Sequence, residues 1–362
     1  MTPMIKTRNS SIDLLKLYFS IIVVLLHIGE SQMPDLFPRG YIVVEGFFMI
    51  TGYFMMNAVS KSQNSDIGKD TLKFITHKFS SFFLPLLFSA IIAFATLIIT
   101  DNYTMQDLVF RSMYLLSEII PLQITGLKSF APTGVSWYLS SMMISLFILY
   151  PVAKKAGSRF TRIICPLLVM LIYGSLCSKY GSLNTIVDLF YGLPIYTGLL
   201  RGIAGICTGC IIFDCVRATE HYQASRFGKI CFAAIEIICF VTITLFLLFF
   251  PKLETDYFIL PVFFILLYCL FGRKSLLSEN ISFGFSKHLG TASLLIYLNH
   301  NYWNYFIGKT MKGHSLATKF GAYFLMIFCS CLIVQGATML TRFLWKKAKP
   351  FLKKHFVNNE PD

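Results

Sequence analysis

The amino-acid sequence predicts an all-α membrane protein, a bundle of about ten transmembrane helices. Of its 362 residues, 55% are hydrophobic and only 14% are charged, and its mean hydropathy is clearly positive. A soluble domain of this size cannot bury so much apolar surface. Apolar windows of about 17 to 25 residues recur along the chain, and each is long enough to cross the ~30 Å hydrocarbon layer as a helix.

These windows define the predicted elements in order. The spanning helices are expected at residues 12–29, 41–58, 79–100, 136–152, 163–178, 195–213, 231–250, 257–271, 289–308 and 320–344. Residues 107–120 are amphipathic and carry Arg111 and Glu118, which favours an interfacial helix in an outer loop over an eleventh span. We assign residues 1–345 to one membrane domain and residues 346–362 to a basic cytoplasmic tail.

The net charge of +14 is explained by membrane topology. With the N-terminus inside, most lysines and arginines fall in the inner loops and tails, as the positive-inside rule requires, and both termini are cytoplasmic. No nucleic-acid partner is needed to explain the charge. Asp13 and Lys16 interrupt the first apolar segment, so we expect it to stay in the membrane rather than to be cleaved as a signal peptide.

The ten cysteines fall in or beside the predicted spans, so a disulfide framework is not expected. Cys207 and Cys210 form a C-x-x-C pattern inside an apolar helix that offers no further ligand residues. We interpret them as packing residues and expect no metal site.

The first predicted helix has a polar line along one side. Asp13, Lys16, Ser20 and His27 lie within about 60° of one another, and Lys16 and His27 are separated by about 16 Å along the axis. Ionisable residues inside spans often mark a functional path. The alternative is that Asp13 and Lys16 pair at the inner interface while His27 sits at the outer one.

Two other predicted spans carry polar groups toward the outer side. Glu45 lies about one turn into the second helix, where a tight hairpin places it at the depth of His27. There it can orient the imidazole of a general base, or it can simply face water. In residues 289–308, a polar face with i, i+3, i+4, i+7 spacing predicts either a cavity wall or a hydrogen-bonded seam between helices. Its members are Tyr297, His300, Asn301 and Asn304.

Arg201 lies inside a predicted span, where an arginine costs several kcal/mol unless it meets water or an anion. It can bind a phosphate or carboxylate of a ligand, or pair with Glu45 or Asp188. The same helix has a smooth face for close helix packing, formed by Gly198, Gly202, Gly205 and Gly209.

In their order along the chain, these features resemble the acyltransferase-3 family of integral-membrane acyltransferases. The family starts with Asp, two apolar residues, Arg, ten residues and His, which appears here as Asp13 to His27 with Lys16 in place of Arg. Its second helix reads acid, one residue, Phe-Phe, two residues, Ser-Gly-(Tyr/Phe), which appears here as residues 45–53 with Thr51 in place of Ser. Later matches are Ser136 to Leu139, Leu200 to Gly209, and Ile296 to His300.

The resemblance implies ten helices and transfer of an acyl group, usually acetyl, from cytoplasmic acyl-CoA to a hydroxyl of a surface polysaccharide or glycolipid. It implies His27 and Glu45 as catalytic residues, a donor substrate of the acetyl-CoA type with no tightly bound cofactor, and a multi-pass protein of a bacterial plasma membrane. Tyr297, His300 or Asn301 then hold the sugar or the developing oxyanion.

One departure from the family concerns the donor. The family often has Arg-x-x-Arg before the third helix, whereas His77 and Lys78 precede Pro85 here. Lys16 and Lys78 must then contact the donor phosphates as point charges, without the bidentate geometry of arginine.

Two other classes of protein fit the same pattern. One is a multi-pass transporter or flippase of a polar or lipid-linked substrate. The other is a membrane sensor or scaffold, which would tolerate the loss of His27 and Glu45.

Overall fold

The computed structural model describes residues 8–32, 36–127, 130–250, 256–281 and 284–356, and within these ranges the chain forms helices and no named strand. The predicted all-α class is confirmed. The α-helices are α1 (Ser10–Gln32), α2 (Val43–Lys61), α3 (Ile67–Thr100), α4 (Met105–Ile119), α5 (Trp137–Ala156), α6 (Cys165–Tyr180), α7 (Thr197–Ala218), α8 (Arg226–Phe249), α9 (Leu260–Gly272), α10 (Leu276–Asn280), α11 (Ser286–Asn299), α12 (Asn301–Thr310) and α13 (Leu316–Phe356).

Eight of the described helical segments are long and apolar enough to cross a membrane, and each corresponds to a predicted span. The predicted span 257–271 is a shorter apolar helix, Asp256–Gly272. The predicted span 289–308 is divided into α11 and α12. Helix α13 runs to Phe356, so it continues into the segment assigned to the tail.

The division between α11 and α12 falls at His300. Nδ1 of His300 lies 2.7 Å from the carbonyl oxygen of Tyr297 and 3.3 Å from that of Ile296. In a continuous helix, the Tyr297 carbonyl would instead accept the backbone N–H of Asn301. The imidazole therefore competes with the helix backbone, and a new helix starts at Asn301.

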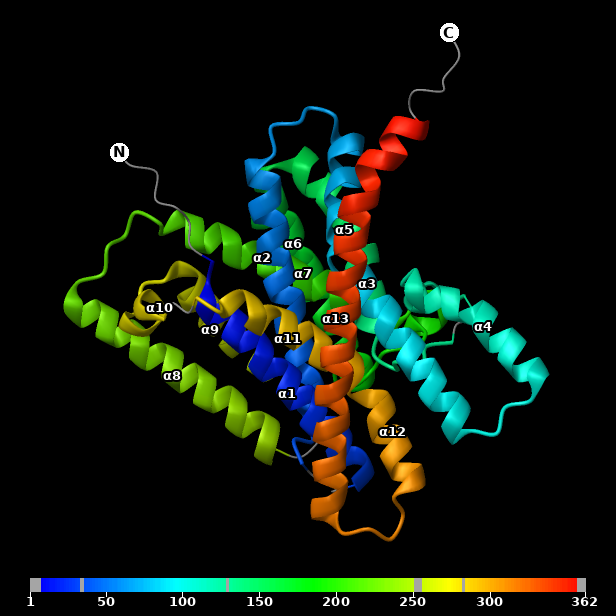
Figure 1. Cartoon of the computed structure of the whole chain (residues 1–362). Helices are drawn as coiled ribbons and strands as arrows, with labels where there is room; N and C mark the ends of the chain where they lie inside the picture. Colours follow the sequence, from blue (N-terminus) through cyan, green and yellow to red (C-terminus); the bar gives the residue numbers. More distant parts are fainter. Residues whose placement is uncertain (1–7, 33–35, 128–129, 251–255, 282–283, 357–362) are drawn as a thin grey trace.

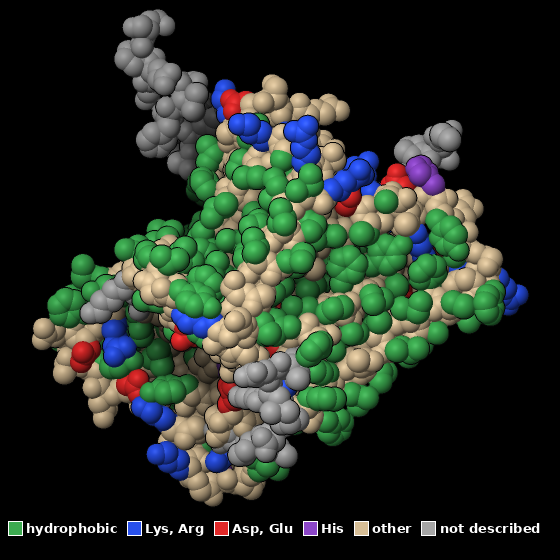
Figure 2. Space-filling view, turned by 180° about the vertical axis from the view of Figure 1, so that it is seen from behind, with side chains coloured by type: hydrophobic (Ala, Val, Ile, Leu, Met, Phe, Trp, Pro, Cys, Tyr) green, Lys and Arg blue, Asp and Glu red, His purple; other side chains and the backbone are tan. Residues whose placement is uncertain are grey.

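The helices form a bundle with α4 at its margin. Figure 1 shows α1 beside α11, and α2 beside α7, whereas α4 lies outside them next to α3. Helix α4 exists as predicted, and its Met105, Phe110 and Met113 are exposed. On the face shown in Figure 2, hydrophobic side chains cover the middle and most charged side chains lie toward the margins.

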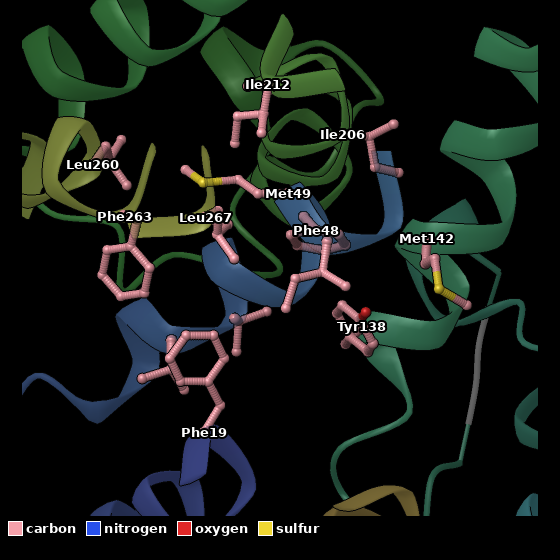
Figure 3. Packing of buried hydrophobic residues seen from close by; sticks show 14 of the residues in the cluster. Phe19, Phe48, Met49, Tyr138, Met142, Ile206, Ile212, Leu260, Phe263 and Leu267 are labelled. Atoms are coloured by element: carbon pink, nitrogen blue, oxygen red, sulfur yellow. The ribbon is translucent and has the colours of Figure 1, made fainter. Parts of the chain in front are cut away.

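The core lies where α1, α2, α5, α7 and α9 meet (Figure 3). Phe19 of α1 packs against Phe263 of α9, with ring centroids 5.7 Å apart. Phe48 of α2 packs against Tyr138 of α5 at 4.8 Å. These contacts fix α2 in the centre of the bundle, buried on most of its surface.

Glycines allow α2 and α7 to approach each other closely. A Cβ atom added at Gly52 would lie 1.9 Å from the carbonyl oxygen of Ile206, and one added at Gly209 would lie 1.9 Å from that of Met49. Both obstacles are backbone atoms, which cannot move aside as a flexible side chain can. The predicted smooth face of α7 is therefore confirmed.

Gly209→Ala is expected to destabilise the protein by about 1–3 kcal/mol, because the added methyl group must push two packed helices apart. Gly174→Ala is the matched control, since a Cβ at Gly174 of α6 meets nothing within 4 Å. The thermal unfolding midpoint in detergent should fall for Gly209→Ala and stay level or rise for Gly174→Ala. Equal midpoints for both variants would show that the helices separate at little cost.

Candidate active site at the end of α1

A cavity of about 540 Å³ opens where the end of α1 meets α12 and the start of α13. Its walls are polar and carry both signs of charge. The lining residues are His27, Glu30, Ser31, Asn301, Asn304, Tyr305, Gly308, Lys309 and Lys319. Two of the residues predicted to form the site, His27 and Asn301, therefore reach the same cavity.

His27 has the geometry of a general base. Its side chain is 28% exposed, and its Nδ1 lies 3.3 Å from Oε2 of Glu30, one turn further along α1. With Nδ1–H directed at the carboxylate, the neutral ring keeps its lone pair on Nε2. Such a histidine can take a proton from a substrate while the carboxylate stabilises the charge that develops on the ring.

His300 lies next to His27 but is fully buried. The two ring centroids are 5.2 Å apart. Nδ1 of His300 donates to backbone carbonyls, so the neutral ring has an acceptor at Nε2. That Nε2 has no hydrogen-bond partner among the described residues, which is unusual for a buried polar atom.

The residues around His300 connect α11 and α12 to their neighbours. The side-chain amide of Asn304 donates to the carbonyl of His27 at 2.8 Å, and its oxygen accepts from Ser31 at 2.6 Å. The hydroxyl of Tyr297 donates to the carbonyl of Val135 at 3.0 Å. The polar face predicted for residues 289–308 thus combines both proposed roles, since part of it lines the cavity and part of it joins helices.

Glu45 is not the carboxylate partner of His27, so that prediction is wrong. One oxygen of Glu45 accepts from Nε of Arg201 at 2.7 Å, and the other accepts from the hydroxyl of Tyr173 at 2.5 Å. Both members of the ion pair are fully buried. The close packing of α2 on α7 explains this arrangement, because a Cβ added at Gly205 would lie 3.3 Å from the Glu45 carboxylate.

Arg201 is occupied by protein groups on several sides. Besides Glu45, it donates to the carbonyl of Thr185 at 3.2 Å and to that of Tyr41 at 3.4 Å. Its guanidinium also lies over the ring of Trp137, 5.2 Å from the centroid. Pairing with Glu45 was one of the two roles open to Arg201, and it is the one found. Neither residue lines the cavity.

Lys16 and Lys78 are found together at the other end of α1. Nζ of Lys16 lies 3.6 Å from Oδ1 of Asp13, which also pairs with Arg8. Lys78 lies on α3, within electrostatic reach of Lys16. The role of Lys16 and Lys78 in contacting the donor phosphates stays a prediction.

Sequence patterns did not single out several residues of the cavity. Glu30 lies just beyond the predicted first span, although its i, i+3 spacing from His27 was visible. Lys309 and Tyr305 both donate to Asp101 at the end of α3, at 2.6 and 2.8 Å. This contact joins segments 208 residues apart, and no local pattern shows such a pairing.

Comparison with protein families matches residues 9–336 to a family described as an acyltransferase domain. The match covers nearly the whole bundle, including the cavity and the lysine cluster. Comparison with curated proteins and with solved structures finds no significant match. The acyltransferase match gives no support to the transporter and scaffold alternatives.

Proposed function

Because the chain belongs to the acyltransferase-3 family of multi-pass membrane acyltransferases, we propose that it moves an acetyl group from cytoplasmic acetyl-CoA to a hydroxyl of an extracytoplasmic glycan or glycolipid. The proposed location is the plasma membrane of a bacterium. The single observation that carries the proposal is His27, which faces the cavity and has the Glu30 carboxylate beside its Nδ1.

In the proposed reaction, Nε2 of His27 takes the proton of the acceptor hydroxyl as the hydroxyl oxygen attacks the thioester carbonyl carbon. An ester bond forms and the carbon–sulfur bond breaks. The protonated His27 then returns the proton to the departing thiolate, which gives free CoA and the neutral imidazole. Glu30 stabilises the imidazolium between these steps. In a second route, Nε2 of His27 attacks the thioester carbonyl and the CoA thiolate departs, which leaves an acetyl-histidine. The acceptor hydroxyl then attacks the acetyl carbon, so that the ester forms, the carbon–nitrogen bond breaks and the hydroxyl proton goes to the thiolate.

Asn301 supports this reaction from the other wall. His300 is fully buried and is not among the residues that line the cavity, so we propose that it acts by packing against the ring of His27 rather than by touching the acceptor. Asn301 lines the cavity and offers an amide to the sugar or the oxyanion. Tyr297 acts indirectly, because its hydroxyl is engaged with Val135.

The donor is proposed to bind at the opposite end of α1. Lys16 and Lys78 bring two positive charges together there, and Arg8 lies next to them on Asp13. Phosphates are attracted to such a cluster. Lys16 and His27 are about 16 Å apart along the helix, so a long donor is required to reach from one to the other.

Transfer itself is tested with the purified protein and acetyl-CoA labelled in the acetyl group, incubated with extracts of envelope glycans and glycolipids. We expect label in an ester that mild alkali releases, together with an equal amount of free CoA. If neither product forms with any extract, while the protein is folded, the proposed function is incorrect.

Lys78→Ala is expected to raise the apparent KM for acetyl-CoA about tenfold, with a smaller effect at saturating donor, because it removes one of two phosphate contacts. The matched control is Lys73→Ala, which removes an exposed lysine of the same helix. Initial rates measured against donor concentration separate the two variants. An unchanged KM in Lys78→Ala would exclude Lys78 from donor binding.

A further inference from the structure

The only residue that α4 buries is a carboxylic acid. Helix α4 has 15 residues, and Glu118 alone among them is buried. One oxygen of its carboxylate accepts hydrogen bonds from the hydroxyls of Thr133 and Ser136. The other oxygen has no hydrogen-bond partner among the described residues. Burial raises the pKa of Glu118 to about 7, and the hydrogen bonds from Thr133 and Ser136 oppose the shift.

A buried carboxyl group with one unsatisfied oxygen is costly. An apolar residue would be the simpler choice for the inner face of an amphipathic helix that otherwise lies on the surface. The acid instead joins α4 to one short segment, Thr133 to Ser136, immediately before α5. Glu118 therefore ties residues 133–136 to α4, and this limits where the neighbours of that segment can lie.

Residues 133–136 do not line the cavity, but they contact Asn301, which lines it, and Tyr297. Gly134 has a positive φ of 71°, and a Cβ added there would lie 2.1 Å from the side-chain amide of Asn301. The next residue, Val135, accepts the hydrogen bond of Tyr297. Both partners flank His300, whose ring packs against that of His27.

We propose that Glu118 is a positioning residue: it holds residues 133–136 against Tyr297 and Asn301, and so fixes the junction of α11 and α12 beside His27. Only the expected effect on catalysis rests on the proposed function. We call this contact between Glu118 and residues 133–136 the clamp. Its effect on the position of residues 133–136 can be measured without an assay of activity.

The position of the segment is measured with Val135→Cys, because Val135 is only 2% exposed. A membrane-impermeant maleimide should label this cysteine slowly when Glu118 is present. In the double variant with Glu118→Ala, the labelling rate should rise about fivefold or more. The parent protein, labelled in parallel, accounts for the native cysteines. Equal labelling rates with and without Glu118 would overturn the clamp.

The effect on catalysis is measured as kcat and the donor KM for acetyl transfer. Glu118→Ala should lower kcat about tenfold or more, since small misplacements of reacting groups are costly, while the donor KM changes less than twofold. Glu118→Gln keeps an oxygen that accepts from the two hydroxyls, so it should recover most of the kcat. Thr133→Val combined with Ser136→Ala should reproduce the loss without altering Glu118.

Asp107→Ala is the control for α4 as a helix. Asp107 caps α4 together with Thr104, but it does not reach residues 133–136. If Asp107→Ala lowers kcat as much as Glu118→Ala does, the effect comes from the stability of α4, and the positioning role is refuted. If the wild type is inactive while the labelling result holds, the proposed function fails and the clamp remains.

Discussion

Replacing His27 by alanine is expected to reduce acetyl transfer by about 10²–10⁴-fold, because it removes the group proposed to accept and return the proton. Binding of the donor should be largely retained, since Lys16 and Lys78 lie at the other end of α1. The expected result is thus a loss of kcat with a nearly unchanged donor KM.

His314→Ala is the matched control, because His314 is exposed in the connection between α12 and α13 and does not line the cavity. It should behave like the wild type. Glu30→Gln should fall between the two, since the neutral amide stabilises the imidazolium less than a carboxylate does. Full activity of His27→Ala, in protein that elutes as a single folded species, would remove His27 from the mechanism.

Glu45→Ala is expected to destabilise the fold by about 3–5 kcal/mol, because it leaves the guanidinium of Arg201 buried without its counter-ion. The double variant with Arg201→Ala should lose less than the sum of the two single changes, since no unpaired charge remains. Asp214→Ala breaks the exposed pair with Arg162, whose side chain is 69% exposed, and should cost no more than about 1 kcal/mol.

The midpoint of thermal unfolding in detergent tests this set of variants, and transfer activity per folded molecule is measured alongside. If Glu45→Ala unfolds at the wild-type temperature, the buried pair is not a structural link between α2 and α7. If its activity is lost as completely as in His27→Ala while the fold is stable, the catalytic role first predicted for Glu45 regains its support.

The helices and their order could be predicted from the sequence because each span is a local property of about twenty residues. The glycine face of α7 was also visible, since Gly198, Gly202, Gly205 and Gly209 repeat with helical spacing. Both predictions depend on composition along one helix. Neither requires knowledge of how helices are turned relative to one another.

The pairing of polar groups could not be predicted in the same way. Glu45 was expected at the depth of His27, but its neighbour Gly46 packs against Phe19 of α1, about two turns from His27. The contact of α2 with α7 also turns Glu45 toward Arg201. The break at His300 has a similar origin, because it depends on a side chain that competes for a backbone carbonyl. Glu118 was noticed only as part of an amphipathic stretch, since its partners Thr133 and Ser136 come after a loop.

The most direct test of the central claim uses inverted membrane vesicles that contain the protein and its native acceptors, with labelled acetyl-CoA added outside. Wild type and His27→Ala are compared at equal amounts of folded protein. The account predicts label in glycan or glycolipid inside the vesicles for the wild type alone. Equal label for the two proteins, or none with the wild type, would contradict acyl transfer across the membrane by His27.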